Sequence, residues 1–268
     1  TRIFGIRGPF NFSVANSRNY MKISITTPTI RPDMMKIVAD SLAKQDFDGE
    51  WEWLVGSPAH LEEEMKQAIG DVPFRFIPEP PKNKGDFYNL NKCWNSLFRQ
   101  AKGELIVNIV DGLWVASDVL SNLWLQFMAN PKACITTVGN QYEVINGKLE
   151  VLIWKDPRMR LDQGSFYQVD YPEMELCLAS IPKQAIVDCK GIKEKFDMFA
   201  ALSEKEMCAR MEKFGYTLWI DQAIVYKAIY HPRIGGNSEW DKHYFEGCNY
   251  MEYCMSQVNR ERELLGDL

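Results

Sequence analysis

Asp111 is the residue whose position most directly suggests chemistry, because it ends an unusually apolar run. The residues before it include Leu105, Ile106, Val107, Ile109 and Val110. A run this apolar and this short predicts a central strand covered on both faces. Ligands of open α/β sheets bind beyond the carboxyl ends of the strands, so Asp111 is a candidate ligand for a metal ion or a substrate. The alternative is that Asp111 and Gly112 only form a turn, since Asp-Gly is a common turn pair.

Length and composition indicate a globular protein. The chain has 268 residues, 46% of them hydrophobic, which is enough for one large α/β domain or for a domain with a small appendage. The formal net charge of -5 excludes a general attraction to polyanions, so a nucleic-acid contact would need a local basic patch. No apolar run approaches the roughly 20 residues that a membrane-spanning helix needs.

The seven cysteines favour a reduced, cytoplasmic protein. Their number is odd, and none belongs to a Cys-x-x-Cys pair. This pattern argues against a disulfide framework and against a structural zinc site. The cysteines are Cys93, Cys134, Cys177, Cys189, Cys208, Cys248 and Cys254.

Residues 1–20 differ from the rest of the chain. They contain three arginines and several aromatic residues but no acidic residue. We expect a surface extension of unknown role. A docking arm, a transit-like segment and an artificial leader ahead of Met21 stay open as alternatives.

Alternating strands and helices predict an α/β fold for the first half of the chain. Strands are predicted at 23–27, 51–55 and 74–77, followed by the central run that ends at Asp111. Helices are predicted at 34–45 and after Gly56-Ser-Pro58, the second with proline near its first position and with Leu61, Met65 and Ile69 as its buried stripe. A third would be capped by Asp86, and its apolar side would be Phe87, Leu90, Trp94, Leu97, Phe98 and Ala101. This spacing implies right-handed crossovers and a mostly parallel sheet through about residue 110.

The second half of the chain is less regular. The expected elements are a helix at 118–128, a strand at 134–138, a hairpin at 142–154 turning at Asn146-Gly147, a short helix after Lys183, a helix at 203–214, strands at 216–220 and 223–228, and a final helix from about Glu239. Residues 155–175 are rich in loops and are expected to cover the crevice. Met207, Met211 and Phe214 are expected to face inward, and the final helix to pack on the same domain.

Three groups of residues follow one another as in a known family. They are Ile23-Ser-Ile-Thr-Thr-Pro-Thr29 with Arg31-Pro32; Asn91-Lys-Cys-Trp-Asn95 through Ala101-Lys-Gly103-Glu104; and Ser180-Ile-Pro-Lys183 followed by Lys190-Gly-Ile-Lys-Glu194, Phe196-Asp197, Arg210 and Phe214-Gly-Tyr216. In this order and spacing, the chain from Met21 to about His231 resembles an inverting glycosyltransferase of family 2. The resemblance implies an α/β GT-A fold (nucleotide-diphospho-sugar transferase-like), with a mixed, mainly parallel sheet flanked by helices.

The resemblance also implies a domain organisation. After the extension at 1–20, one GT-A-like domain is expected over 21–268. Its nucleotide-binding half covers about 21–115, and its acceptor-binding and catalytic half covers about 116–235. A helix at about 239–265 follows.

A divalent cation, Mn²⁺ or Mg²⁺, is implied as the partner of the donor diphosphate. The family holds this ion with Asp-x-Asp, whereas Val110-Asp111-Gly112 offers a single carboxylate. One hard ligand can suffice, because these ions keep several waters and take other oxygens from the phosphates. His231 stands where the fold often supplies a further metal ligand. Its alternative role is that of a surface histidine beside Pro232.

Glu204 is the catalytic base that the resemblance implies. The family uses the second residue of a Glu-Asp pair that opens a late helix, and here Ser203-Glu204 occupies that place. A positioned carboxylate can deprotonate an acceptor hydroxyl group. The alternative is a role at the helix start, where Ser203 caps the helix and Glu204 and Glu206 favour the positive end of its dipole. Glu206 is the second choice of base, and Asp197 the third.

The resemblance places the donor nucleotide over the ends of the first two strands. The expected donor contacts are Thr27, Thr29, Arg31, Ser57 and Lys84, with Asp111 below the diphosphate. Ser57 stands where the family offers an aspartate to the nucleoside. UDP is the expected carrier because it is the commonest in the family. Trp114 is a candidate to stack on a sugar, or a core tryptophan, and Asp162, Gln163 and Asp170 are candidate acceptor contacts.

Together these assignments predict a direct displacement. An acceptor hydroxyl group attacks the anomeric carbon from the face opposite the diphosphate, Glu204 takes its proton, and the cation at Asp111 neutralises charge on the leaving group. The acceptor stays open among a glycan, a lipid-linked glycan, a protein and a modified nucleic acid.

Three other functions are alternatives to this one. A catalytically weakened homologue that binds a sugar nucleotide or a glycan is the strongest, because two acidic positions of the family are lost. A nucleotidyltransferase would also place a metal at a strand end, but the chain lacks a Gly-x-x-x-x-Gly-Lys phosphate loop. A dinucleotide-dependent oxidoreductase is disfavoured because Pro28-Thr29, and not Gly-x-Gly-x-x-Gly, follows the first strand.

Overall fold

The structure is a computed structural model of the chain, and it describes residues 21–145, 148–199, 202–230 and 236–265. The predicted extension at 1–20, the predicted hairpin turn at 146–147 and His231 lie outside the described residues.

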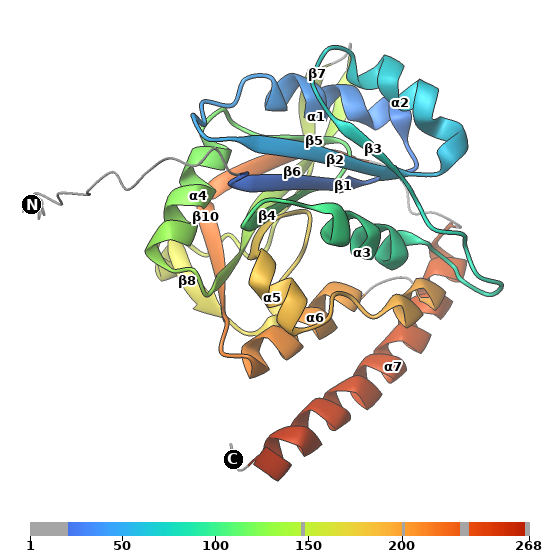
Figure 1. Cartoon of the computed structure of the whole chain (residues 1–268), viewed down its shortest axis with the longest axis vertical. Helices are drawn as coiled ribbons and strands as arrows, with labels where there is room; N and C mark the ends of the chain where they lie inside the picture. The colour runs from blue at the N-terminus through green and yellow to red at the C-terminus, as the bar shows by residue number, and fades with distance from the viewer. Residues whose placement is uncertain (1–20, 146–147, 200–201, 231–235, 266–268) are drawn as a thin grey trace, which may run out of the picture.

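A mixed sheet runs through the middle of the molecule (Figure 1). Its strands are β1 (Ile23–Pro28), β2 (Trp51–Ser57), β3 (Arg75–Pro78), β4 (Leu105–Ile109), β5 (Leu113–Trp114), β6 (Ala133–Ile145), β7 (Lys148–Lys155), β8 (Phe166–Val169), β9 (Leu178–Pro182) and β10 (Thr217–Ile229). The order is β3-β2-β1-β4-β9-β6-β10-β5, with β7 beside β6 and β8 beside β10. The pairings give β1, β2, β3, β4, β6 and β10 one common direction. The predicted mainly parallel sheet is therefore confirmed.

Helices cover both faces of this sheet. They are α1 (Met35–Leu42), α2 (Glu62–Ile69), α3 (Leu90–Gln100), α4 (Val119–Ala129), α5 (Lys183–Asp188), α6 (Ser203–Lys213) and α7 (Gly236–Leu265), with short 3₁₀ turns η1 (Pro32–Met34), η2 (Ala59–Leu61), η3 (Leu161–Gln163), η4 (Tyr171–Glu173) and η5 (Glu194–Met198). Buried side chains of α1, α2 and α4 join one core cluster, and those of α3, α5 and α6 join the other. The sheet is the layer between these two cores.

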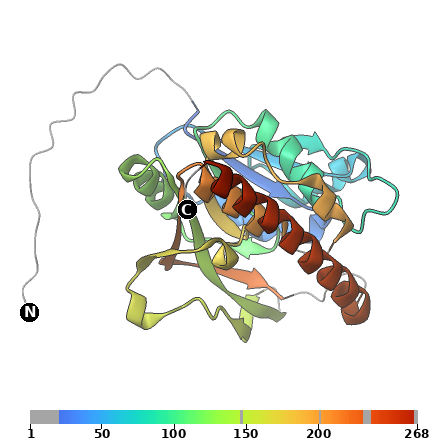
Figure 2. The ribbon, with the colours of Figure 1, turned by 90° about the horizontal axis from the view of Figure 1, so that it is seen from below.

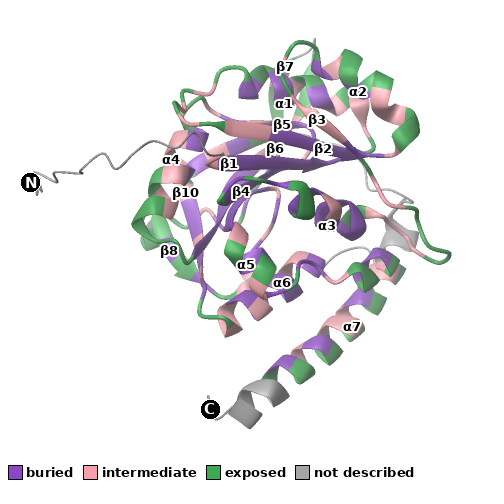
Figure 3. Cartoon of the chain, viewed as in Figure 1, coloured by how far each residue is buried: buried purple, intermediate pink, exposed green. Residues whose placement is uncertain are grey.

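β4 is the buried central strand that its apolar sequence predicts. All five of its residues are buried, and the surrounding strands are buried as well (Figure 3). Leu105, Val107 and Ile109 pack into the core with α1, whereas Ile106 packs into the core with α3. This alternation follows from the two-residue period of a strand, so β4 can only stand where helices cover both faces.

The strand order reverses between β1 and β4. From β1 the chain adds β2 and then β3 on one side, and afterwards places β4 on the other side of β1. The loops that leave β1 and β4 contact each other there, since the Gly112 N–H group donates to the Met34 carbonyl oxygen at 3.1 Å. In open α/β sheets this reversal point is where ligands bind.

Three strands were not predicted, and the shortest of them is β5, which pairs with β10. β9 inserts between β4 and β6 and runs antiparallel to both, and β8 pairs with β10 inside the segment predicted as loops. β9 has five residues and ends at Pro182, which cannot donate to a sheet ladder, so its sequence resembles a loop. The two strands predicted at 216–220 and 223–228 are one strand, β10, with an irregularity between Asp221 and Val225.

The predicted cap of α3 is wrong. The helix begins at Leu90, and Asp86 lies before it, where its carboxylate accepts hydrogen bonds from Lys92 Nζ and from the Asn83 N–H group. The first turn of α3 is capped by Asp197 instead. Asp197 Oδ1 accepts from the Asn91 N–H group at 2.8 Å, and Oδ2 accepts from the Lys92 N–H group at 3.1 Å.

We expect Asp197→Ala to lower the free energy of unfolding by about 2 kcal/mol, because it removes the acceptors of two buried N–H groups. Thermal unfolding should show a lower Tm. Asp197→Asn should lose less stability than Asp197→Ala, because the amide oxygen still accepts one of the two hydrogen bonds. Equal Tm values for the wild type and the alanine variant would contradict this role.

The last helix packs on the same domain, as expected. α7 contacts α6 and η5, and Figure 2 shows it crossing the lower side of the molecule. Its Cys254 is buried with Phe196 and Leu202. Phe214, predicted to face inward, is 47% exposed because α6 ends one residue before it. No helix of the described chain is long and apolar enough to cross a membrane.

Candidate active site

The Asp111 carboxylate is held in a hydrogen-bonded cluster at the carboxyl ends of β1 and β4. Arg31 Nε donates to Asp111 Oδ2 at 3.0 Å, and Arg31 Nη2 donates to Oδ1. The Thr29 hydroxyl group also donates to Oδ2, and it accepts from the Arg31 N–H group at 2.9 Å. Three of the predicted donor-binding residues therefore meet at one point, between the ends of β1 and β4. These three residues form hydrogen bonds with one another.

Arg31 and Asp111 differ in accessibility. The Asp111 side chain is only 6% exposed, whereas the Arg31 side chain is 29% exposed. A guanidinium group has five N–H donors. The Asp111 carboxylate accepts hydrogen bonds from two of them, the Nε–H group and one N–H group of Nη2. Among the described residues, no acceptor for Nη1 is found. The exposed part of the cluster is thus the Arg31 guanidinium group, whose Nη1 donors have no acceptor among the described residues.

This arrangement does not fit the predicted divalent metal site. Both carboxylate oxygens of Asp111 accept hydrogen bonds from a cation or a hydroxyl group, so an ion could bind them only by displacing Arg31. The next residue, Gly112, has no side chain to offer. Within the described ranges, no group of three or more His, Cys, Asp or Glu side chains could hold a metal ion. The role of Asp111 as a metal ligand stays a prediction, and in the structure its partners are Arg31 and Thr29.

The other predicted donor contacts are distributed around this cluster. Thr27 is fully buried and its hydroxyl oxygen accepts from Trp53 Nε1 at 3.0 Å, so it supports the core. Ser57 ends β2 with a buried Oγ that has no hydrogen-bond partner within the described chain. Lys84 is exposed in the loop that follows β3.

Glu79 is a candidate that the sequence reasoning missed. It directly follows β3, and its N–H group donates to the Ser57 carbonyl oxygen at 2.9 Å. Burial raises the pKa of its carboxyl group, and the charge of Asp197 adds to the rise. An acid therefore stands beside Ser57, where the family's aspartate is absent. The sequence signal that could have identified Glu79 is a carboxylate at the end of a strand between two prolines, in Pro78-Glu79-Pro80.

Glu204 lies half-buried in the first turn of α6. Burial raises the pKa of its carboxyl group above the ordinary value of 4.5, and the neighbouring charge of Glu175 raises it further. Ser203 Oγ donates to Oε2 at 3.2 Å, and no ion pair with Glu204 is found among the described residues. A desolvated carboxylate without a cationic partner is suited to accept a proton.

Glu204 and Asp111 lie at the same end of the sheet. The Val110 N–H group donates to the Cys177 carbonyl oxygen at 3.0 Å, which fixes Cys177 beside the end of β4. Burial is the main cause of the raised pKa of the Cys177 thiol, and the charge of Glu204 contributes to it. The same charge acts on Tyr244 of α7. The charge of Glu204 thus acts on residues beside the end of β4 and on the last helix.

The two alternative bases are bound in structural contacts. Glu206 is fully buried, and its carboxylate is paired with Arg210 at 2.7 Å and with Lys193 at 2.7 Å. Asp197 caps α3. Of the three acids, Glu204 alone lacks an ion pair or a capping role within the described chain.

The remaining predicted residues lie in mixed surroundings. Trp114 is half-buried in β5, with Lys227 Nζ 5.3 Å from the centre of its ring. Asp162, Gln163 and Asp170 are exposed. The Ile229 N–H group donates to the Gly112 carbonyl oxygen at 2.9 Å, so the end of β10 adjoins the loop after β4. His231, which follows, stays a prediction.

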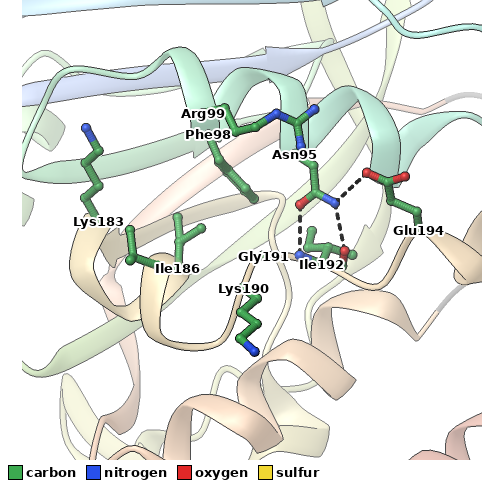
Figure 4. Close-up of a pocket in the computed structure, with 10 residues that line it drawn as sticks. Asn95, Phe98, Arg99, Lys183, Ile186, Lys190, Gly191, Ile192 and Glu194 are labelled. Carbon is green, nitrogen blue, oxygen red and sulfur yellow. Dashed lines mark hydrogen bonds between the residues drawn. The ribbon is translucent and has the colours of Figure 1, made fainter.

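A pocket of about 470 Å³ lies elsewhere, between α3, α5 and the segment at 190–194 (Figure 4). Asn95 forms part of its wall, donating to the Ile192 carbonyl oxygen at 2.8 Å and to Glu194 at 3.0 Å. Lys183 also lines the pocket, and its backbone N–H group donates to the backbone carbonyl oxygen of Glu104, just before β4. The pocket therefore reaches the amino end of β4, whereas Asp111 lies beyond its carboxyl end.

Comparison with known proteins gives a likeness of fold. No family model matches the chain, and no curated protein sequence matches it. GalNAc-T7, solved with UDP, GalNAc and Mn²⁺, is 13% identical and aligns with a TM-score of 0.60 over 80% of this chain and 45% of its own. The mannosyltransferase PcManGT from Pyrobaculum calidifontis, solved with GDP-Man and Mn²⁺, is 17% identical, with a TM-score of 0.57 over 87% of this chain and 63% of its own.

A third similar structure is TarS 1-349 of S. aureus in complex with UDP, which is 16% identical with a TM-score of 0.54 over 79% of this chain and 61% of its own. The chain thus spans about half to two thirds of the length of the structures it matches. Its mixed α/β sheet flanked by helices has the GT-A arrangement of these glycosyltransferases. The predicted fold class is confirmed.

Proposed function

We propose that this chain transfers a sugar from a nucleoside-diphosphate sugar to a hydroxyl group of an acceptor, with inversion at the anomeric carbon, as family 2 glycosyltransferases do. The observation that carries the proposal is the pair of groups at one end of the GT-A sheet. Glu204 offers a desolvated carboxylate, and the Arg31–Asp111 pair lies at the strand reversal point.

The chemistry is a single displacement. The acceptor oxygen forms a bond to the anomeric carbon while the bond from that carbon to the diphosphate oxygen breaks, and the pair of electrons leaves with the nucleoside diphosphate. Glu204 takes the proton of the acceptor hydroxyl group. The raised pKa of Glu204 supports this role, because a stronger base accepts the proton more readily.

Donor recognition is proposed at the ends of β1, β2 and β3. Ser57 has a buried hydroxyl group without a protein partner, and such groups usually find one in a ligand or a water. With Glu79 beside it, Ser57 is the proposed contact for the nucleoside, and Lys84 for a phosphate. UDP is the proposed carrier.

A test that needs no known acceptor is slow hydrolysis of the donor. The purified chain would be incubated with UDP- and GDP-sugars, and release of the nucleoside diphosphate measured. Retention or inversion is then read from the anomeric proton of the released sugar by NMR. Release of UDP or GDP with an inverted sugar is the expected result. No binding of either diphosphate at millimolar concentration would refute the proposal.

The second candidate is a homologue that binds a sugar nucleotide without turning it over. The hydrogen bonds that hold both Asp111 oxygens favour it, because the family's metal-binding carboxylate is otherwise engaged. The hydrolysis assay together with calorimetric titration of the same sugar nucleotides separates the two functions, since a binder would give a binding signal and no release.

A further inference from the structure

We propose that Arg31, and not a divalent metal ion, supplies the positive charge that binds the donor diphosphate, and that Asp111 is the positioning residue that holds this guanidinium group in place. The inference rests on the proposed function and specifies how its donor site works. It predicts a site that binds nucleoside diphosphates in the absence of metal ions.

The carboxylate oxygens at the end of β4 are already engaged in hydrogen bonds. A metal site in this position needs carboxylate oxygens that are free to coordinate. Asp111 binds Arg31 through both oxygens, in the two-pronged geometry that guanidinium and carboxylate groups prefer. Thr29 adds a third hydrogen bond to the same carboxylate. The Asp111 oxygens that would coordinate a metal ion instead orient the Arg31 guanidinium group.

Arg31 is the more accessible member of this pair. The Arg31 side chain is 29% exposed and covers an Asp111 side chain that is only 6% exposed. A ligand approaching this pair therefore reaches the guanidinium group before it reaches the carboxylate. The Arg31 Nη1 N–H groups, for which the described residues offer no acceptor, match phosphate oxygens in geometry and charge. Because Asp111 already fixes the rotamer, little side-chain entropy is lost on binding.

The position of Arg31 in the fold also suits a diphosphate. It follows β1, while Asp111 follows β4, and these two strands flank the reversal point of the sheet. In open α/β sheets a diphosphate binds at this point. The Arg31–Asp111 pair therefore bridges the two loops between which the diphosphate would lie.

The test is isothermal titration of the purified chain with UDP, GDP and the corresponding nucleosides, each in EDTA and again in Mn²⁺. We expect the diphosphate affinity to be the same in both buffers. Arg31→Gln should weaken diphosphate binding roughly 10- to 100-fold, the usual effect of losing a hydrogen bond between two charged groups. It should leave nucleoside binding unchanged. Arg31→Lys keeps the positive charge but loses the two-pronged hydrogen bonding of a guanidinium group, so it should lose less diphosphate affinity than Arg31→Gln.

Two variants control this experiment. Arg75→Gln makes the same substitution at the amino end of β3, where Arg75 bonds Glu52 and the Gln100 carbonyl oxygen, and should bind UDP like the wild type. Asp111→Asn should weaken UDP binding less than Arg31→Gln, because the amide oxygen still accepts from Arg31. Its residual binding should still be independent of metal. A metal ligand would give the opposite result, with binding that needs Mn²⁺ and is lost in Asp111→Asn.

The outcomes separate this inference from the proposed function. Diphosphate binding that requires Mn²⁺, or that is insensitive to Arg31→Gln, overturns the inference and leaves the transferase proposal standing. Absence of diphosphate binding in both buffers overturns both.

Discussion

Glu204→Gln is expected to slow sugar transfer by a factor of about 10² to 10⁴ while leaving the folded protein at least as stable as the wild type at neutral pH. The loss of rate follows from removal of the proton acceptor that the proposal assigns to the acceptor hydroxyl group. Donor hydrolysis or transfer, measured together with thermal unfolding, checks both halves of the expectation.

The stability half follows from the direction of the pKa shift. Burial raises the pKa of Glu204 in the folded state, so the folded protein holds the proton more tightly than the unfolded chain does. As the pH rises from the ordinary value of 4.5 through the raised pKa, this group therefore lowers the stability of the fold. A neutral glutamine avoids that cost. Active sites often carry such a conflict between stability and function.

Glu206→Gln is the matched control on the same helix. Glu206 is paired with Arg210 and Lys193, so its replacement leaves two cations without their buried partner and should lower the Tm. If Glu206→Gln abolished transfer without lowering the Tm, and Glu204→Gln were active, the assignment of the base would be wrong.

The pH dependence of transfer gives an independent check. Protonated Glu204 cannot accept a proton, so kcat/KM should fall as the pH decreases through the raised pKa of this residue. The midpoint of the acid limb should therefore lie above 4.5. A profile without an acid limb down to pH 4.5 would contradict a base with a raised pKa.

Arg158→Ala should produce the largest loss of stability, about 3–5 kcal/mol. Asp156 is 1% exposed, and Arg158 contacts it through Nε at 3.0 Å and Nη2 at 2.6 Å. Arg158 also donates to the carbonyl oxygens of Thr137 and Glu173. Its removal leaves a buried carboxylate without a counter-charge. The expected decrease in Tm is about 6–20 °C.

Arg160→Ala is the control for that variant, two residues away. Arg160 pairs with Glu173 at 2.6 Å, but both side chains are partly exposed, and such pairs contribute about 1 kcal/mol or less. Asp156→Asn combined with Arg158→Ala should recover part of the loss, because no buried charge is then left unpaired. Similar Tm values for the two single variants would show that burial does not strengthen the Arg158 pair.

The parts of the fold that were predictable are those with local signals. The apolar run of β4 and the spacing of strands and helices around it indicated a central buried strand and a parallel half-sheet, and both are present. The insertion of β9 was not predictable in the same way. Its place between β4 and β6 depends on contacts between segments far apart in the sequence, and its five residues have no distinctive period.

The candidate site shows the same division. Asp111, Thr29 and Arg31 were each selected from the sequence as donor contacts, but not as partners of one another. Their hydrogen bonds join residues 80 or more positions apart, and they arise only because β1 and β4 are neighbours. Likewise, the cap of α3 comes from Asp197, more than 100 positions away, and Asp86 was chosen only because it lay nearby.

The late position of β9 in the chain affects how the protein is made. Until Leu178–Pro182 has been synthesised, β4 exposes a row of unpaired N–H and C=O groups on the side that β9 will cover. At about 5–20 residues per second, a ribosome needs several seconds to advance from β4 to β9. The nascent first half is therefore an aggregation-prone species during translation, and overproduction should benefit from slow synthesis or from chaperones that shield an open strand.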